Sequence, residues 1–321
     1  IYLNRTFLAN RLYYEVKRLM PILVGFTIMF VVFNRDYDFV QFLDVGQGDA
    51  ALIHVDHKNY LIDSGGDLSR PGFVGENILE PYLIKNGFRN IEAGFITHFD
   101  YDHYGGFTEV SDDINIKFLV SDHMPIEIEE DINLDEFIKK VIQMNRKNIE
   151  IGGKYKLVDM VYEKSSDFEN NASLVLKLVK DDINLALFSG DIESEAEEKL
   201  LESDLHSFIL KVPHHGSKTS STEEFLKRVS PKYAIISVGR NNRYGHPNDV
   251  VLKRLENICE VYRTDKDGLV TFDLENYKIY SYLNNKNYFN YVYILIVLIA
   301  SFYIVEKVGE RDELYKLFEK N

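Results

Sequence analysis

The ten residues THFDYDHYGG, from Thr97 to Gly106, place four metal-ligand side chains within six positions: His98, Asp100, Asp102 and His103. The apolar residues before His98 predict the end of a β-strand, and we expect FDYDHYGG to form the loop that leaves it. In an extended backbone alternate side chains point the same way, so His98 and Asp100 would face one position and Asp102 and His103 a second one nearby. These nitrogen and oxygen donors suit a pair of divalent ions such as zinc or manganese.

The simpler interpretation, a polar turn with incidental histidines, is disfavoured because further ligand-type residues follow other apolar runs. LIDSGG puts Asp63 at a strand end, where its carboxylate could orient a ligand by hydrogen bonding. LFSGDIE puts Asp191 after a strand, where a carboxylate between two cations could bridge them and help lower the pKa of a shared water. The other histidines of this kind are His214 and His215 in KVPHHGSKTSS and His246 in RYGHP.

Polar residues near these motifs are further candidates. DVGQGD, from Asp44 to Asp49, predicts a tight turn between the first two strands, with Asp44 or Asp49 bracing the site from behind. Ser217 and Lys218 could meet a phosphate oxygen, although a solvated turn explains them almost as well.

The middle of the chain predicts a layered α/β domain, because short apolar runs bounded by turn residues alternate with amphipathic patterns. The predicted strands are residues 39–45, 49–56, 58–66, 91–98, 173–180, 183–191, 207–215, 233–239 and 277–283, and the predicted helices are residues 74–87, 134–148, 194–203 and 248–257.

Composition excludes several classes of protein. The formal net charge of −14 argues against a surface that binds nucleic acid by general neutralisation of phosphates. The single cysteine, Cys259, excludes an intrachain disulfide framework and a cysteine-rich zinc site.

Two uncharged apolar stretches flank this domain. Met20–Phe33 is short for a membrane span, and a buried helix is its alternative, whereas Asn287–Val305 is predicted to be a transmembrane helix. Lys and Arg flank both stretches on their outer sides, so both tails are predicted to be cytoplasmic and the middle segment extracellular. The expected organisation is a tail and membrane segment (1–36), one domain (37–286), a transmembrane helix (287–305) and a cytoplasmic tail (306–321).

The ordered set of HFDYDH, DVGQGD, IDSGG, SGD, VPHHGSKTS and YGHP resembles the metallo-β-lactamase superfamily, and within it the domain found in the ComEC family of DNA-uptake (competence) proteins. The resemblance covers residues 39–282. It implies a four-layer αββα sandwich with two divalent ions, manganese or zinc, at one edge. Carried over by position, His98 and Asp100 would serve one metal, Asp102, His103 and His215 the other, and Asp191 would bridge them.

The resemblance leaves some roles open. Either His215 or His246 could match the last metal-binding histidine of the superfamily, while His214 and His246 could hold a phosphate or protonate a leaving oxygen. Asp100 stands where histidine is commoner in the superfamily, which shifts the preference toward harder ions such as manganese or magnesium. No histidine lies between His123 and His206, so an extra ligand of the first metal is missing or replaced, with Asn171 the best-placed polar candidate.

The function implied is a membrane-anchored, metal-dependent phosphodiesterase or nuclease that degrades the DNA strand not imported during uptake. It would act at the cell membrane on the extracellular side, with single-stranded DNA as substrate and other DNA-uptake proteins as partners. Two alternatives stay open. One is an extracellular phosphodiesterase for a small or cell-wall substrate, and the other is a non-catalytic module that docks DNA or a partner at a membrane channel.

Overall fold

The computed structural model describes residues 37–122, 141–143, 148–160 and 170–283, together with Leu19 and Gly25. Residues 37–284 form one compact unit. Within the described ranges no helix has both the length and the apolar character needed to cross a membrane. The predicted segments Met20–Phe33, apart from Gly25, and Asn287–Val305 lie outside the described residues.

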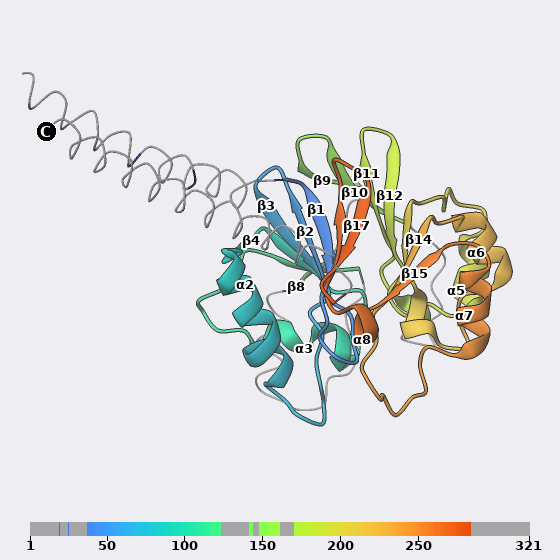
Figure 1. Cartoon of the computed structure of the whole chain (residues 1–321), viewed down its shortest axis with the longest axis horizontal. Helices are drawn as coiled ribbons and strands as arrows, with labels where there is room; N and C mark the ends of the chain where they lie inside the picture. The colour runs from blue at the N-terminus through green and yellow to red at the C-terminus, as the bar shows by residue number, and fades with distance from the viewer. Residues whose placement is uncertain are drawn as a thin grey trace, which may run out of the picture. The chain divides into compact units, whose positions relative to one another are not determined.

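Two large sheets face each other in this unit (Figure 1). In the described residues the first sheet has the order β17-β16-β1-β2-β3-β5-β7-β8. It is antiparallel from β17 to β3 and parallel from β3 to β8. Its strands are β1 (Phe39–Phe42), β2 (Ala51–Val55), β3 (Lys58–Ile62), β5 (Ala93–Phe95), β7 (Leu119–Ser121), β8 (Val141–Gln143), β16 (Val270–Asp273) and β17 (Lys278–Ser281).

The second sheet has the order β15-β14-β13-β12-β11-β10-β9 among the described strands. It is parallel from β12 to β15 and antiparallel from β9 to β12. Its strands are β9 (Asn148–Gly152), β10 (Tyr155–Asp159), β11 (Leu176–Lys180), β12 (Ile183–Phe188), β13 (Ile209–Lys211), β14 (Tyr233–Ile236) and β15 (Glu260–Arg263). A separate parallel pair joins β4 (Asn90–Ile91) and β6 (Asn115–Ile116).

Helices cover the outer face of each sheet, which gives four layers in the order helix, sheet, sheet, helix (Figure 1). The first sheet is covered by η1 (Gly75–Leu79), α2 (Glu80–Asn86) and α3 (Tyr101–Glu109). The second is covered by α5 (Ser194–Leu200), α6 (Glu223–Val229) and α7 (Asp249–Glu256). Three short helices lie in connections: η2 (Asn170–Ala172), η3 (Pro213–Gly216) and α8 (Thr264–Asp267).

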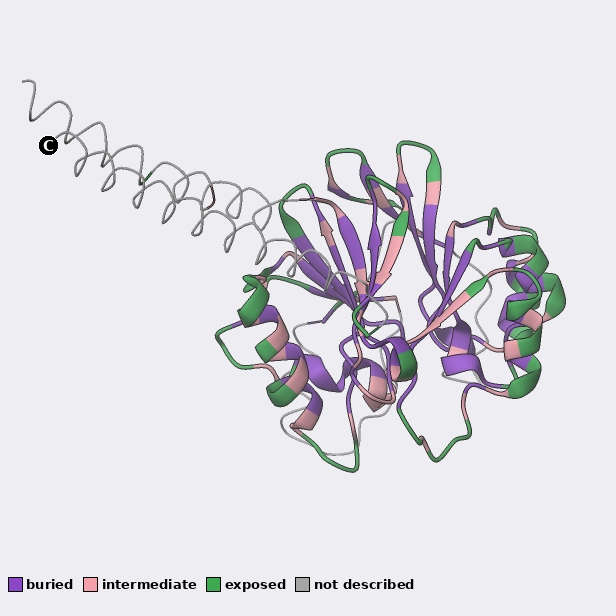
Figure 2. Cartoon of the chain, in the orientation of Figure 1, coloured by how far each residue is buried: buried purple, intermediate pink, exposed green. Residues whose placement is uncertain are grey.

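The main core lies between the two sheets, where alternate residues of facing strands point inward. Figure 2 shows that the strands are buried along most of their length, because helices cover their outer faces. On β1, Val40 and Phe42 face this core, whereas Phe39 packs outward with the helices. Phe42 meets Phe188 of the second sheet with ring centroids 6.0 Å apart. Alternate side chains of these strands therefore hold the two sheets together, and the intervening ones hold the helices.

Three of the four predicted helices are confirmed, but the helix predicted over 134–148 is wrong where the structure describes it. Val141–Gln143 is strand β8, and Asn148 begins β9. β8 pairs in parallel with β7 at the edge of the first sheet, so β-branched residues at 141 and 142 extend that sheet instead of continuing a helix.

The loop predicted after the strand at Phe95 is also partly wrong, because helix α3 begins at Tyr101. Gly106 lets this helix lie directly on the chain after β3, since a β-carbon there would collide with the carbonyl oxygen of Ser64. The backbone amide of Ser64 donates to the carbonyl of His103, and that of Gly106 donates to the carbonyl of Gly65. The ligand motif thus rests on a helix anchored to the Asp63 turn.

Candidate metal centre

The carboxyl ends of five strands, β1, β3, β5, β12 and β13, meet at one edge of the sandwich. Strands β1, β3 and β5 run in one direction in the first sheet, and β12 and β13 run together in the second. Connections after such strands converge at one edge, which is where α/β proteins bind ligands. The predicted ligand residues lie in these connections, and this explains how residues far apart in the sequence form one site.

The first ligand segment joins β5 to α3. His98 lies in the connection, Asp100 immediately precedes the helix, and Asp102 and His103 are in its first turn. The rings of His98 and His103 have centroids 4.0 Å apart, and both residues are buried. Nε2 of His98 lies 3.5 Å from Oδ2 of Asp100. Because the helix starts here, His103 returns to the side of His98 instead of pointing only to a second position.

Asp63 orients His103. Its backbone has a φ of 56°, in the left-handed region, which aspartate tolerates better than most residues. Oδ1 accepts a hydrogen bond from the amide of Thr97 at 2.8 Å, and Oδ2 accepts one from the Thr97 hydroxyl at 2.7 Å. Oδ2 also lies 2.8 Å from Nδ1 of His103. A carboxylate that holds one ring nitrogen leaves the other, Nε2, directed to the centre.

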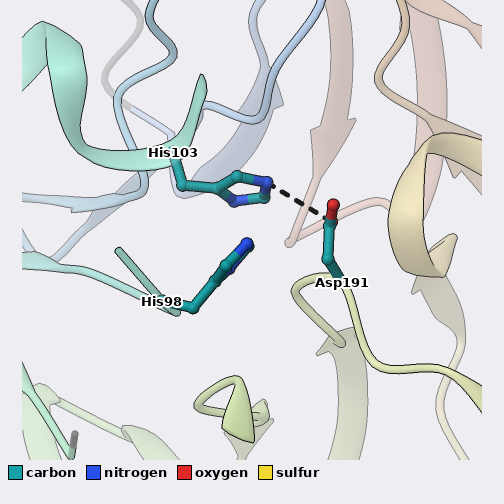
Figure 3. A group of neighbouring side chains, drawn as sticks. All are labelled: His98, His103 and Asp191. Carbon is teal, nitrogen blue, oxygen red and sulfur yellow. Dashed lines mark ion pairs between the residues drawn. The ribbon is translucent and has the colours of Figure 1, made fainter. Parts of the chain in front are cut away.

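Asp191 stands between the two groups of histidines. Its Oδ1 lies 3.3 Å from Nε2 of His103, a contact that Figure 3 marks with a dashed line. Its Oδ2 lies 3.4 Å from Nε2 of His215. The carboxylate is buried, and its backbone amide donates to Oγ of Ser173 at 3.2 Å. Each oxygen of Asp191 therefore faces a different imidazole, which is the arrangement that a bridging carboxylate requires.

The paired histidines follow β13 in a strained turn. His214 and His215 have φ of 49° and 52°, a conformation that costs free energy in residues other than glycine. The two side chains consequently diverge, with His215 buried and the His214 side chain 22% exposed. Nδ1 of His215 hydrogen-bonds to the carbonyl of Ser237 at 2.8 Å, and its Nε2 lies 3.3 Å from Oδ2 of Asp102.

His214 lies nearer the rim. Its Nε2 is 3.8 Å from Oδ2 of Asp191, and its Nδ1 is 3.3 Å from Oε1 of Glu193. The ring of His246 follows at a centroid distance of 5.8 Å, and the ring of Tyr244 stacks on His246 at 6.0 Å. A row of rings thus leads outward from the centre to Tyr244, whose surface is 54% exposed.

The structure adds Lys211, which the sequence interpretation missed. This lysine ends β13, is buried, and contacts the Asp49 carboxylate with its ammonium. Nζ also donates to the carbonyl of Gly190 at 3.1 Å and lies 3.6 Å from Oδ1 of Asp191. Nothing in the sequence marks this lysine as part of the site, except that it lies in an apolar strand directly before the VPHH motif.

Several buried donor atoms have no hydrogen-bond partner among the described residues. Besides Tyr155 Oη and Ser221 Oγ elsewhere, those at this site are Oδ1 of Asp49, Nε2 of His98, Nε2 of His103, Oδ1 of Asp191, Nδ1 of His214, Nε2 of His215 and Nδ1 of His246. Buried polar atoms are normally satisfied, so this concentration needs an explanation. The atoms are of the types that ligate metal, and a bound cation accounts for those that converge.

The spacing of the donors fits divalent cations. His98, His103 and Asp191 offer atoms that all lie within 4.8 Å of one another, as do Asp102, His103 and His215. Ligands about 2.1 Å from one tetrahedral ion lie about 3.4 Å apart. The separations of 3.3 Å from His103 to Asp191 and 3.4 Å from His215 to Asp191 match that value.

The electrostatics of the site favour positive charge. Burial opposes protonation of His215, but Asp191 and Asp49 outweigh it and raise its pKa to about 10. Burial likewise opposes protonation of His103, yet Asp191 and Asp63 raise its pKa well above the ordinary value. The pKa of Asp191 would rise through burial, but His215 and His103 hold it well below its usual range. Carboxylates that stabilise imidazolium so strongly also attract metal ions.

For the remaining predicted residues the structure gives contacts with groups other than these donors. Asp44 is half-buried on the loop after β1, where burial raises its pKa and Arg240 opposes the rise. Oδ1 of Asn171 accepts a hydrogen bond from the amide of Glu193 at 2.8 Å, so this atom orients Glu193. Oγ of Ser217 lies 2.9 Å from Oγ1 of Thr219, and Lys218 is exposed.

Comparison with known proteins gives the chain its relatives. Residues 43–123 match the family model described as "Metallo-beta-lactamase superfamily". The chain is 32% identical over 281 residues to "ComE operon protein 3" of Bacillus subtilis, covering 78% of this chain and 35% of the relative. It is 30% identical over 240 residues to "Competence protein ComA" of Neisseria gonorrhoeae, covering 72% of this chain and 31% of that protein.

A third relative is "Recombination protein 2" of Haemophilus influenzae, 32% identical over 236 residues, with coverage of 73% of this chain and 28% of that protein. The chain therefore spans about a third of the length of these curated relatives. Among solved structures, a metallo-hydrolase of Ignicoccus hospitalis is similar with a TM-score of 0.48 and 16% identity, covering 74% of this chain and 99% of that one.

Proposed function

This chain belongs, through its metallo-β-lactamase superfamily domain, to the ComEC family of competence proteins, and from that premise we propose that it is a metal-dependent phosphodiesterase that hydrolyses single-stranded DNA. The superfamily and the ligand clusters support a metal-dependent hydrolase. The observation that carries the proposal is the convergence of unsatisfied nitrogen and oxygen donors of His98, His103, Asp191 and His215.

We assign two divalent ions to these donors, with manganese or zinc as candidates. His98, Asp100 and His103 would hold one ion, Asp102 and His215 the other, and Asp191 would bridge them. Bound there, the ions would supply Lewis acidity toward phosphoryl oxygens and lower the pKa of water. The partly exposed Asp100 and Asp102 leave this side of the centre open, with 45% and 32% of their side chains accessible. A phosphodiester would approach from that side.

His214 is the group that we propose to protonate the leaving oxygen. It lies at the rim, with its Nδ1 3.3 Å from Oε1 of Glu193. Asn171 fixes the backbone of Glu193, and the Thr219 hydroxyl donates to Oε1 of Glu193 at 2.7 Å. These contacts fix Glu193, which in turn holds His214 with its Nε2 toward Asp191. His246, whose pKa is lowered by burial and by the neighbouring histidines, is suited to bind phosphate as a neutral donor.

The residues at the rim of the site favour a nucleic acid over a small phosphodiester as the substrate. Tyr244 is exposed and carries the Arg243 guanidinium 5.0 Å from its ring centroid. An aromatic ring with an adjacent arginine offers stacking to a base and charge to a phosphate. The net charge of −14 opposes tight binding elsewhere on the protein. We therefore expect weak affinity for DNA outside the site.

The named relatives also motivate a proposal about setting. We propose that the chain acts in DNA uptake, at the cell membrane with its catalytic domain outside, together with other competence proteins. One relative is called "Competence protein ComA" and another "ComE operon protein 3", and the apolar segments before and after the domain support membrane attachment. Separation of cell membranes, followed by protease treatment of intact cells, tests the location and the orientation.

The activity is tested by incubating the purified full chain with Mn²⁺ and two substrates, end-labelled single-stranded DNA and bis(p-nitrophenyl) phosphate. Metal-dependent cleavage of the DNA supports the proposal. Hydrolysis of the small diester without DNA cleavage would favour the alternative enzyme, a phosphodiesterase for small substrates. A chain that binds metal and cleaves neither compound would favour the docking module.

A further inference from the structure

The ammonium of Lys211 is buried within the candidate metal centre. Lys211 is 3% exposed at the carboxyl end of β13, a central strand of the second sheet. Its Nζ contacts Asp49 from the first half of the fold, and the Gly190 carbonyl and Oδ1 of Asp191 from the second half. All of these partners are themselves buried. The ammonium of Lys211 therefore interacts with buried groups of the site and not with groups at the protein surface.

A second buried lysine of the same sheet provides the contrast. Lys177 on β11 is 5% exposed, but its ammonium reaches Asp204, whose side chain is 70% exposed. This is the usual solution for lysine, with an apolar stem inside and the charge near water. Lys211 does not follow it, and a buried charge is costly unless it is paired. Its location requires a compensating negative charge, which Asp49 provides.

Asp49 belongs to a group of side chains that could hold a metal ion. Its carboxylate forms a group with Asp191 and His215 whose donor atoms all lie within 4.8 Å of one another. Oδ1 is 3.4 Å from Nδ1 of His215 and has no hydrogen-bond partner among the described residues. Oδ2 is the atom that contacts the Lys211 ammonium. The lysine thus occupies the position from which a cation would bind this carboxylate.

The sum of the charges at the centre also indicates that the Lys211 ammonium compensates a carboxylate. Five carboxylates line the centre: Asp49, Asp63, Asp100, Asp102 and Asp191. Two divalent ions together with one ammonium carry five positive charges, so the site is neutral when the histidines are neutral ligands. Without Lys211, two ions would leave one buried carboxylate uncompensated.

We propose that Lys211 is a built-in cation of the metal centre, which neutralises Asp49, keeps it out of the ligand set, and so limits the centre to two divalent ions. Lys211 is a positioning residue, since it acts through Asp49 and Asp191. The inference rests on the metal binding within the proposed function, and is independent of the substrate.

The test is a count of bound Mn²⁺ in the full chain, after saturation and removal of free metal, by elemental analysis and by titration calorimetry. The variants are Lys211→Met, Asp49→Asn and the double substitution. Lys177→Met is the matched control, because it removes the charge of another buried lysine of the same sheet, whose ammonium pairs with an exposed carboxylate outside the ligand clusters. Neither readout depends on hydrolysis.

Lys211→Met is expected to take up one more Mn²⁺ per chain than the unsubstituted protein, because Asp49 becomes a free carboxylate. Asp49→Asn in the same chain is expected to return the count to that of the unsubstituted protein, and Lys177→Met is expected to leave it unchanged. A simple structural role for Lys211 would not produce a gain of metal that a second substitution reverses.

The inference is overturned if Lys211→Met binds the same number of ions as the unsubstituted chain, or loses metal in a way that Asp49→Asn does not reverse. If Lys211→Met does not fold, the double variant decides, because removal of both charges should restore folding and the original count; an unfolded double variant overturns the inference. An unsubstituted chain that binds no Mn²⁺ would overturn the proposed function as well.

Discussion

Nε2 of His103 lies 3.3 Å from Oδ1 of Asp191, and this contact joins the two halves of the fold at the centre of the site (Figure 3). His103 comes from helix α3 on the first sheet, and Asp191 follows β12 of the second. The distance is that expected for two ligands of one ion. The packing of the two sheets therefore sets the geometry of the centre, and changes that separate them should first weaken metal binding.

Asp63→Asn tests whether the orientation of His103 matters. Asparagine tolerates the left-handed backbone of this residue, but it replaces the charged acceptor of His103 by an amide. Loss of such a partner usually costs about 10- to 100-fold in metal affinity. We expect that reduction in Mn²⁺ affinity, measured by calorimetry, with a cooperative unfolding transition retained. Unchanged affinity would mean that packing alone holds His103.

Gly48→Ala tests the close approach of the Asp49 turn to helix α3. A β-carbon at residue 48 would collide with the backbone carbonyl oxygen of Asp102, whereas one at Gly46 would meet open space. Both glycines have positive φ, so Gly46→Ala is a control for backbone strain. We expect Gly48→Ala to lower the free energy of unfolding by about 1–3 kcal/mol more than the control, in urea denaturation. Equal losses in the two variants would contradict the close contact.

The metal-free chain should lose stability as pH rises. The pKa of His215 is about 10 in the folded protein and 6.5 ordinarily, so the folded state keeps a proton that the unfolded chain loses. This contribution is complete below about pH 6.5 and is lost as pH rises toward 10. Urea unfolding in a chelator should show a decline between pH 7 and 9.5, and His215→Asn should reduce it. Stability that rises across this range would refute the assignment.

Metal affinity should change in the opposite direction with pH. Imidazole binds metal only when it is deprotonated, so Mn²⁺ binding must release the protons that Asp191, Asp49 and Asp63 hold on His215 and His103. Calorimetry in buffers of different ionisation enthalpy should detect proton release, with affinity increasing from pH 7 to 9. Binding without proton release would place the metal on other donors.

Tyr244→Ala tests the role of the rim in substrate choice. Base stacking on an aromatic ring is worth about 1–3 kcal/mol, so kcat/KM for single-stranded DNA should fall by about 5- to 150-fold. The loss on bis(p-nitrophenyl) phosphate, which is too small to extend along the rim, should be much smaller. Tyr282→Ala, which removes another exposed tyrosine, is the control. Equal losses on both substrates would assign Tyr244 to the structure of the loop.

The layered α/β class and most candidate ligands could be predicted from sequence, because ligand-type residues directly follow apolar strands. His98, His103, Asp191 and His215 meet for that reason. Helix α3 was missed because Gly105 and Gly106 argue locally against a helix, and only the close contact with Ser64 explains Gly106.

Lys211 could not be found in this way. Its role depends on Asp49, which the chain brings to it from the other sheet, and no local pattern carries that information. The strand at Val141–Gln143 shows the same limit, because its pairing with β7 overrides a helical pattern of apolar residues. Both the role of Lys211 and the strand at Val141–Gln143 depend on contacts between residues that are far apart in the sequence.

The most direct test of the central claim is Mn²⁺-dependent cleavage of end-labelled single-stranded DNA by the full chain and by Asp191→Asn, with bound metal measured in both. Asp181→Asn, which changes an exposed aspartate outside the ligand clusters, is the control. Asp191→Asn is expected to lose metal and to cleave at least about a thousandfold more slowly, while the control retains its metal and its rate. Cleavage at the unsubstituted rate by Asp191→Asn would contradict the proposed metal centre.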